Sequence, residues 1–301
     1  MTTSLSERTA PAAIPSVPQP PQVVALARLG ELRRAMAPVP RRRQLDKEPS
    51  TWSVNLWRGG VVLTIFVLWE VGARLGWIDS FFWSQPSQIW NTAVIAFQAG
   101  DILTNAGFTF ASTIAGFVIG VVGGVGIGLS FWWSRRYALV AEPLVIAFDA
   151  MPKLALAPII VLVLGIGMNS KIAMATALVI VIQVLNTYAA VRSVDRDLTT
   201  LMYSLGASRW QVFTKVVVPS VLPWVASSLR VAIGLSLSGA VVGEYIGSKS
   251  GLGRMIQYAG STYDIPLIWV GVFTLAALSA LLYVVVSGLE RRLLKGAHRT
   301  N

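Results

Sequence analysis

The amino-acid sequence predicts an all-α, polytopic membrane protein, a bundle of about six transmembrane helices. Of its 301 residues, 54% are hydrophobic and only 13% are charged. Several apolar runs reach the ~20 residues that a helix needs to cross a bilayer. In lipid, only helices and closed barrels satisfy all their backbone hydrogen bonds, and these runs are too long and too uniformly apolar for barrel strands.

Six spans can be drawn along the chain. They cover approximately residues 60–78, 105–133, 138–167, 172–190, 219–246 and 266–288. The second and third are long enough to tilt or to contain a break. Pro152 and Pro158 favour a bend in the third, because proline removes a helical hydrogen bond. We therefore expect a disordered, basic, Pro-rich tail at 1–58, a transmembrane domain at 59–292 and a short tail at 293–301.

The distribution of basic residues predicts the topology. Nineteen Lys and Arg residues lie in 1–59, 134–142, 191–217 and 290–301, against three in the alternate loops 79–104, 168–171 and 247–265. Because cytoplasmic loops carry the excess of positive charge, both termini and the loop at 195–218 are predicted to be cytoplasmic. The net charge of +11 is thus explained by the membrane and not by nucleic acid. The basic N-terminal tail either lies on anionic lipid or makes a regulatory contact.

The motifs that the chain lacks exclude most enzyme classes. There is no cysteine, and no G-x-x-x-x-G-K-[ST] sequence that would cradle nucleotide phosphates. The single histidine, His298, lies near the C-terminus, and no His/carboxylate cluster has the spacing of a metal site. We expect a chain that is not an enzyme and that binds no cofactor or metal of its own.

A polar interlude at 195–223 predicts a helix–turn–helix between two spans. Its first helix carries an apolar stripe at i, i+3, i+4 and i+7, formed by Leu198, Leu201, Met202 and Leu205. Asp195 and Asp197 at its start complement the helix dipole, and Gly206 follows its end, where a left-handed conformation costs glycine little.

The second helix of this loop begins at a capping box, Ser208-Arg209-Trp210-Gln211. It places apolar side chains on one face, namely Trp210, Phe213, Val216 and Val217. Pro219 and Pro223 follow as the chain re-enters an apolar run. Such a loop is suited to be gripped by another protein.

Polar residues inside the spans are candidates for function or for packing. Glycines recur every four residues in the second span, at Gly116, Gly120, Gly124 and Gly128, and allow a close helix approach within the chain or across a dimer. Glu70 and Arg74 are spaced i, i+4, as are Asp149 and Lys153, so each pair can neutralise locally. Arg230 has no such partner and either attracts an anionic substrate or holds carbonyl groups.

A translocation path is predicted between a bent third span and a fifth span rich in small residues. Glu244 lies near the outer end of that fifth span, where it would fix the outer gate or the following loop. The candidate path residues are Pro152, Pro158, Gln183, Asn186, Arg230, Ser236, Ser238 and Glu244.

The loop resembles the signature loop of the permeases of ATP-binding-cassette importers, in which a glycine is followed thirteen residues later by proline, here Gly206 and Pro219. Three segments are similar to the nitrate/sulfonate/taurine branch: 152–167 (PKLALAPIIVLVLGIG), 205–210 (LGASRW) and 243–255 (GEYIGSKSGLGRM). The resemblance covers about residues 63–289. It departs at 200–202, where Thr-Leu-Met replaces the usual glutamate and alanines.

This resemblance implies a type I importer permease fold and alternating access driven by a separate ATPase subunit. The coupling residues would be Leu201, Leu205, Gly206, Ala207, Ser208, Arg209, Trp210, Phe213 and Pro219. It further implies a bacterial inner-membrane location, a second permease copy and an extracytoplasmic solute-binding protein. The solute would be a small anion or zwitterion such as an aliphatic sulfonate, taurine or nitrate.

The alternative function is an ATP-independent carrier or channel. No pair of interrupted helices recurs in two halves, as many carriers require, and no span carries the arginine array of a voltage sensor. A structural scaffold would explain neither the capped loop nor the small polar residues of the fifth span.

Overall fold

The computed structural model describes residues 51–297, and the regular elements in this range are helices. The longer helices are α2 (Thr51–Arg74), α5 (Asp101–Ser130), α6 (Arg135–Ala150), α8 (Met168–Arg192), α11 (Val218–Ile246) and α13 (Ile265–Ala297). The shorter ones are α3 (Ser80–Trp83), α4 (Pro86–Gln98), α7 (Ala157–Leu164), α9 (Arg196–Ser204), α10 (Arg209–Val212) and α12 (Leu252–Ser261).

The helices confirm the prediction of about six spans. Five stretches are long and apolar enough to cross a membrane, and a bent pair, Arg135–Ala150 and Lys153–Leu164, makes a sixth if it counts as one span. The two halves of this pair meet at 77°, with Pro152 at the break and Pro158 in the first turn of α7. The third span is therefore broken, because neither proline can donate the hydrogen bond that a continuous helix needs.

The predicted tails fall largely outside the described residues. Residues 1–50 and 298–301, which include His298, are not among them. Residues 51–58, expected in the N-terminal tail, form the first part of α2, and residues 293–297 belong to α13.

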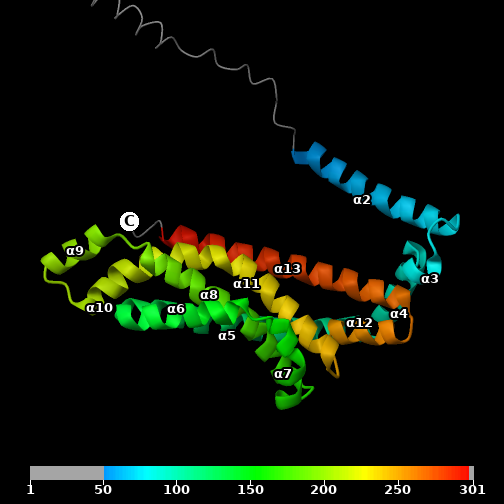
Figure 1. Ribbon diagram of the computed structural model, residues 1–301. Coiled ribbons are helices and arrows are strands. Elements are labelled where there is room, and N and C mark those ends of the chain that lie inside the picture. The colour runs from blue at the N-terminus through cyan, green and yellow to red at the C-terminus, as the bar shows by residue number, and fades with distance from the viewer. Residues whose placement is uncertain (1–50, 298–301) are drawn as a thin grey trace, which may run out of the picture. The chain divides into compact units, whose positions relative to one another are not determined.

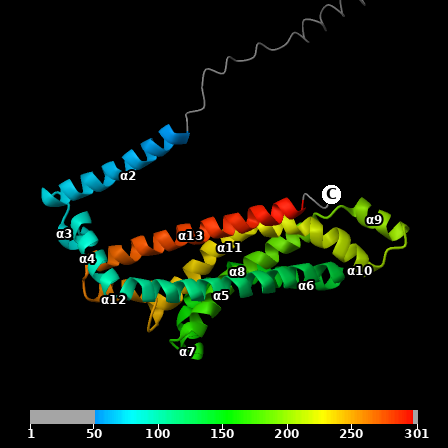
Figure 2. The same ribbon diagram turned by 180° about the vertical axis from the view of Figure 1, so that it is seen from behind.

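The chain divides into two compact units, residues 1–62 and 63–301, with the boundary inside α2. In the second unit, α5, α8, α11 and α13 run alongside one another (Figure 1). The short helices α9 and α10 lie at one end of this bundle, and α4 and α12 lie at the other, as the reverse view also shows (Figure 2). The bundle thus separates two loop regions at opposite ends of its helices.

The glycine stripe of α5 packs within the chain, against α8. A Cβ atom built on Gly116 would lie 2.3 Å from the Cβ of Ala175, and one on Gly124 would lie 2.5 Å from the Cβ of Gln183. These separations are shorter than real carbon contacts, so only glycine lets the two helices approach this closely. Of the two roles that the sequence left open, the structure shows the intrachain one.

Candidate functional site

The loop at 195–218 forms a capped helix–turn–helix at one end of the bundle. Asp195 caps α9 by accepting a hydrogen bond from the backbone N–H of Asp197 at 2.7 Å. Gly206 has a φ of +80°, and the backbone N–H of Ala207 donates to the carbonyl of Met202 at 3.0 Å. This hydrogen bond closes the end of α9, so the predicted glycine turn is confirmed.

The start of the second helix is also as predicted. The hydroxyl of Ser208 accepts a hydrogen bond from the backbone N–H of Gln211, whose side chain accepts one from the backbone N–H of Ser208. After α10, the chain continues through a π-helical turn, η3 (Phe213–Val217), directly into α11. Pro219 lies in the first turn of α11, where its missing N–H leaves no helical acceptor unsatisfied.

Apolar side chains of this loop remain uncovered. Leu205 is 75% exposed, Trp210 60% and Leu201 55%. Exposed leucines and a tryptophan on a capped, rigid turn are typical of a protein–protein contact.

An aromatic cluster that the sequence did not predict attaches the loop to the end of α5. The ring of Trp210 stacks on that of Trp133 with centroids 6.0 Å apart, and Phe213 lies 5.4 Å from both Trp132 and Trp133. Arg209 lies over both indole rings and donates a hydrogen bond to the carbonyl of Trp133. Movement of the loop is thereby linked to the end of α5.

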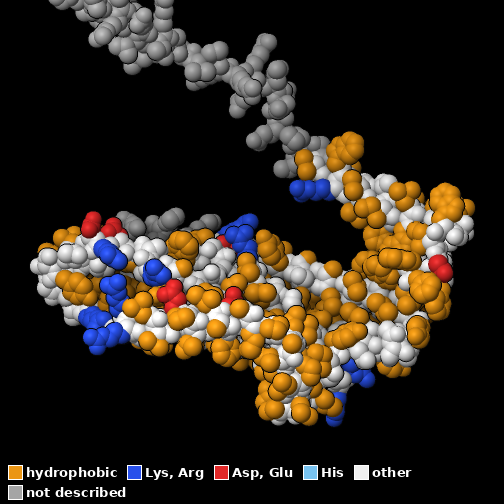
Figure 3. Space-filling model, in the orientation of Figure 1, with side chains coloured by type: hydrophobic (Ala, Val, Ile, Leu, Met, Phe, Trp, Pro, Cys, Tyr) orange, Lys and Arg blue, Asp and Glu red, His pale blue; other side chains and the backbone are white. Residues whose placement is uncertain are grey.

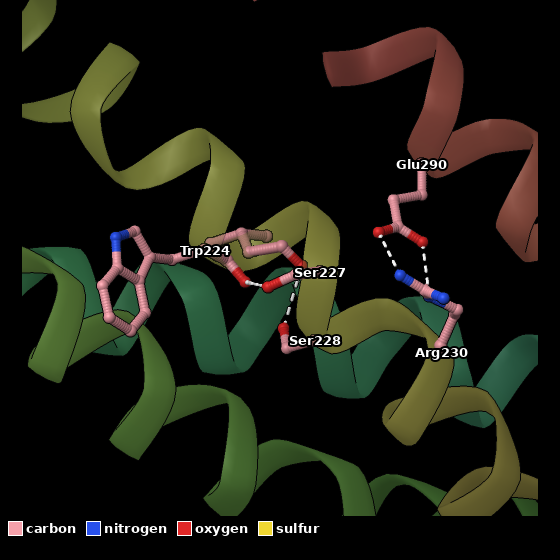
Figure 4. A network of polar contacts seen from close by, with 6 residues as sticks. Trp224, Ser227, Ser228, Arg230 and Glu290 are labelled. Carbon is pink, nitrogen blue, oxygen red and sulfur yellow. Dashed lines mark hydrogen bonds and ion pairs between the residues drawn. The ribbon is translucent and has the colours of Figure 1, made fainter. Parts of the chain in front are cut away.

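The expectation that Arg230 is an unpaired cation is wrong. Its Nε atom lies 2.6 Å from Oε2 of Glu290, and its Nη2 atom donates to Oε1 at 2.8 Å (Figure 4). The pair joins α11 to α13 across sixty residues of sequence, and Glu290 is buried. The guanidinium is therefore neutralised and is not available as a free attractor of anions.

The other predicted ion pairs are confirmed. Arg74 lies 2.6 Å from Glu70, and Lys153 lies 2.9 Å from Asp149.

The structure separates the remaining path candidates into buried and exposed residues. Gln183 accepts a hydrogen bond from the hydroxyl of Ser228 at 2.7 Å, and Ser236 donates to the carbonyl of Thr113 at 2.7 Å. Both Gln183 and Ser236 are fully buried between helices, whereas Asn186 is half-buried. Ser238, Pro152 and Pro158 are exposed.

Glu244 holds the loop that follows α11, as one of its two predicted roles required. Its Oε2 atom accepts hydrogen bonds from the backbone N–H of Gly253 at 2.9 Å and from the hydroxyl of Thr109 at 3.0 Å. Gly251 adopts a φ of +115°, and a Cβ atom there would lie 2.3 Å from the carboxyl carbon of Glu244. The G-x-G sequence thus permits the loop backbone to close over a buried carboxylate of α11.

Lys171 differs from its predicted place. The sequence assigned it to an outer loop, but it lies fully buried near the start of α8. Its ammonium group donates hydrogen bonds to the carbonyl of Ile166, the hydroxyl of Ser170 and the carbonyl of Gly247. These acceptors replace water around the charge, which is why the lysine can be buried.

Comparison with known proteins identifies the family. A model described as "Binding-protein-dependent transport system inner membrane component" matches residues 116–298. The chain belongs to this family. It is a multi-pass inner-membrane permease subunit of an ATP-binding-cassette importer, and this transmembrane component lacks an ATPase domain.

Three curated relatives match most of the chain. It is 31% identical to the riboflavin transport system permease protein RibX of Chloroflexus aurantiacus, over 78% of this chain and 87% of that one. It is 32% identical to the formylaminopyrimidine transport permease protein ThiX of Halalkalibacterium halodurans, over 77% and 92%. It is 27% identical to the taurine transport system permease protein TauC of Escherichia coli, over 84% and 93%.

A solved structure supports the fold. An inward-facing conformation of the MetNI methionine ABC transporter matches with a TM-score of 0.53 and 20% identity, over 65% of this chain and 95% of that one. At this identity the match establishes the helical architecture alone. The type I importer fold inferred from the signature loop is thereby confirmed.

Proposed function

We propose that this permease couples ATP hydrolysis on a separate subunit to solute import through the loop at 195–218. The exposed Leu205, next to the left-handed turn at Gly206, is the observation that carries the proposal. Closure of two ATPase subunits would draw the two copies of this loop together and open the pathway outward, and hydrolysis would reset it. Both termini and this loop then lie in the cytoplasm, in agreement with the bias of basic residues.

A second copy of this chain would complete the pathway. On α11, Ser227, Gly234 and Ser238 are exposed at helical spacing, and a Cβ atom on Gly234 would meet no atom within 4 Å. A surface of small and hydroxyl-bearing residues in the middle of a span is poorly matched to lipid and well matched to a polar passage or a close helix contact. Pro152 and Pro158 lie at the bend of the third span, and α7 beyond it contacts α11.

The solute is a finer question, and two classes have support. The anion or zwitterion class of sulfonates, taurine and nitrate is supported by the similarity to TauC. We favour a small polar heterocycle, because the relatives of higher identity are named for riboflavin and formylaminopyrimidine transport. The three cations within the predicted spans, Arg74, Lys153 and Arg230, are each held in an ion pair, so recognition by hydrogen bonds fits the pathway better than attraction of an anion.

Reconstitution tests the coupling. The permease, the ATPase and the solute-binding protein encoded beside it are placed in proteoliposomes, and uptake of solute is followed with and without ATP. Uptake that requires ATP and both partners supports the proposal. Uptake by the permease alone down a solute or ion gradient would favour the alternative, an ATP-independent carrier or channel.

Calorimetric titration of the solute-binding protein tests the solute class. Riboflavin and formylaminopyrimidine are compared with taurine, an aliphatic sulfonate and nitrate. Binding of a heterocycle alone supports our preference, and binding of an anion alone contradicts it.

A further inference from the structure

A pocket of about 380 Å³ lies where α6, α8, α9 and the short helix η1 (Phe131–Trp133) meet. We propose that this pocket binds the phosphate of an anionic phospholipid headgroup. The residues that line it come from four elements: Phe131, Trp132, Arg135, Ala138, Leu139, Glu142, Tyr188, Val191, Arg192 and Arg196.

Three arginines converge on the pocket from three helices. Arg135 begins α6, Arg192 ends α8 and Arg196 begins α9. Lys and Arg side chains gather over this end of the bundle, near α9 and α10 (Figure 3). Guanidinium groups present several N–H donors in a plane, and this geometry suits the oxygens of a phosphate group.

The pocket holds a surplus of positive charge. Its one carboxylate, Glu142, lies 3.2 Å from Arg192 and accepts a hydrogen bond from the hydroxyl of Tyr188 at 3.1 Å. Within residues 51–297, Arg135 and Arg196 form no ion pair. Two guanidinium groups therefore face the pocket without a counterion from the described part of the chain.

The rest of the lining favours a lipid over a free ion. Phe131, Leu139 and Val191 give the pocket an apolar wall beside its arginines, and a phospholipid presents an apolar chain beside its phosphate in the same way. Trp132 adds an aromatic ring of the kind that lies at headgroup level. Basic pockets between helices on the cytoplasmic side are known to bind anionic headgroups.

The location gives such a lipid a role in coupling. Arg196 is the first residue of α9, the helix that carries the exposed Leu201, whereas Arg135 and Arg192 belong to the bundle. A phosphate held by all three would tie the coupling loop to α6 and α8. The cytoplasmic placement of the pocket rests on the proposed topology, but the binding itself does not.

Lipid titration of the full-length permease in detergent, read by native mass spectrometry, tests the proposal. Dioleoyl phosphatidylglycerol is compared with zwitterionic dioleoyl phosphatidylcholine. The double variant Arg135→Gln/Arg196→Gln should bind phosphatidylglycerol about 30-fold more weakly, since each basic residue contributes about 1 kcal/mol near an anionic lipid. The control Arg136→Gln/Arg291→Gln removes the same charge outside the pocket and should bind like the wild type.

A third variant gives the opposite sign. Glu142→Gln removes the negative charge from the pocket and keeps an oxygen that can accept the Tyr188 hydrogen bond, so phosphatidylglycerol should bind several-fold more tightly. This variant keeps the test informative even if the double variant folds poorly.

Three results would overturn the proposal. One is equal binding of the two lipids, and another is equal loss in the pocket and control variants. The third is displacement of phosphatidylglycerol by millimolar inorganic phosphate that binds the pocket without lipid, which would identify a free anion as the ligand. The titration uses neither ATPase nor solute, so a failure of ATP-driven uptake would count against the proposed function and leave the lipid result standing.

Discussion

Replacement of Gly206 by valine tests how the loop transmits force. Gly206 has a φ of +80°, and a Cβ atom there would meet nothing within 4 Å. The substitution therefore creates no clash, and its cost arises from the backbone alone. Holding an ordinary L-residue in the left-handed region costs about 1–2 kcal/mol, and a β-branched residue is especially disfavoured there.

The cost predicts a measurable change in docking. If the ATPase recognises only the turn as the structure shows it, 1–2 kcal/mol lowers the population of that turn about 5- to 30-fold. Affinity for the ATPase subunit, measured with the permease in nanodiscs, should fall by a similar factor, and ATP-driven uptake should fall with it. The amount of folded permease in the membrane should stay the same.

Gly206→Asn is the matched control. Asparagine adopts the left-handed conformation more readily than other non-glycine residues, so this variant should retain most of the affinity. Equal affinity and equal uptake for the valine and asparagine variants would refute the argument, because the turn conformation would then have no part in coupling.

Three further changes probe the bundle. Arg230→Gln leaves the buried carboxylate of Glu290 without its cation, so the melting temperature of the detergent-solubilised permease should fall; unchanged stability would show that the ion pair contributes nothing. Gly124→Ala forces α5 away from α8 and should destabilise the protein by about 1–3 kcal/mol in equilibrium unfolding, whereas Gly126→Ala, on the same helix with open space around it, should be neutral. Glu244→Ala leaves two buried donors unsatisfied, at about 1–3 kcal/mol each, and should speed hydrogen exchange at 247–253 more than at 195–218; uniform exchange rates would contradict its role as the anchor of the outer loop.

Local features of the site were predictable from the sequence. The glycine turn and the Ser208–Gln211 capping box depend on residues within three or four positions of each other, so spacing alone indicates them. The i, i+4 ion pairs, Glu70–Arg74 and Asp149–Lys153, were predictable for the same reason.

Contacts between distant residues were not predictable in this way. Glu290, sixty positions from Arg230, was counted with the charges of the C-terminal segment, and no periodicity connects the two. The attachment of Trp210 to Trp133 likewise depends on how α5 and the loop meet in space. Lys171 looked like a loop charge because its acceptors, the carbonyls of Ile166 and Gly247, carry no signal in the side-chain sequence.

Site-directed crosslinking of Leu205 tests the central claim most directly. The chain contains no cysteine, so Leu205→Cys introduces a unique thiol to which a photoactivatable crosslinker can be attached. Leu205 is 75% exposed, and Tyr263, 72% exposed beyond α12 at the other end of the bundle, provides the matched control as Tyr263→Cys. The account predicts that the Leu205 position crosslinks to the ATPase subunit and the Tyr263 position does not. A crosslink from Tyr263 and none from Leu205 would contradict it.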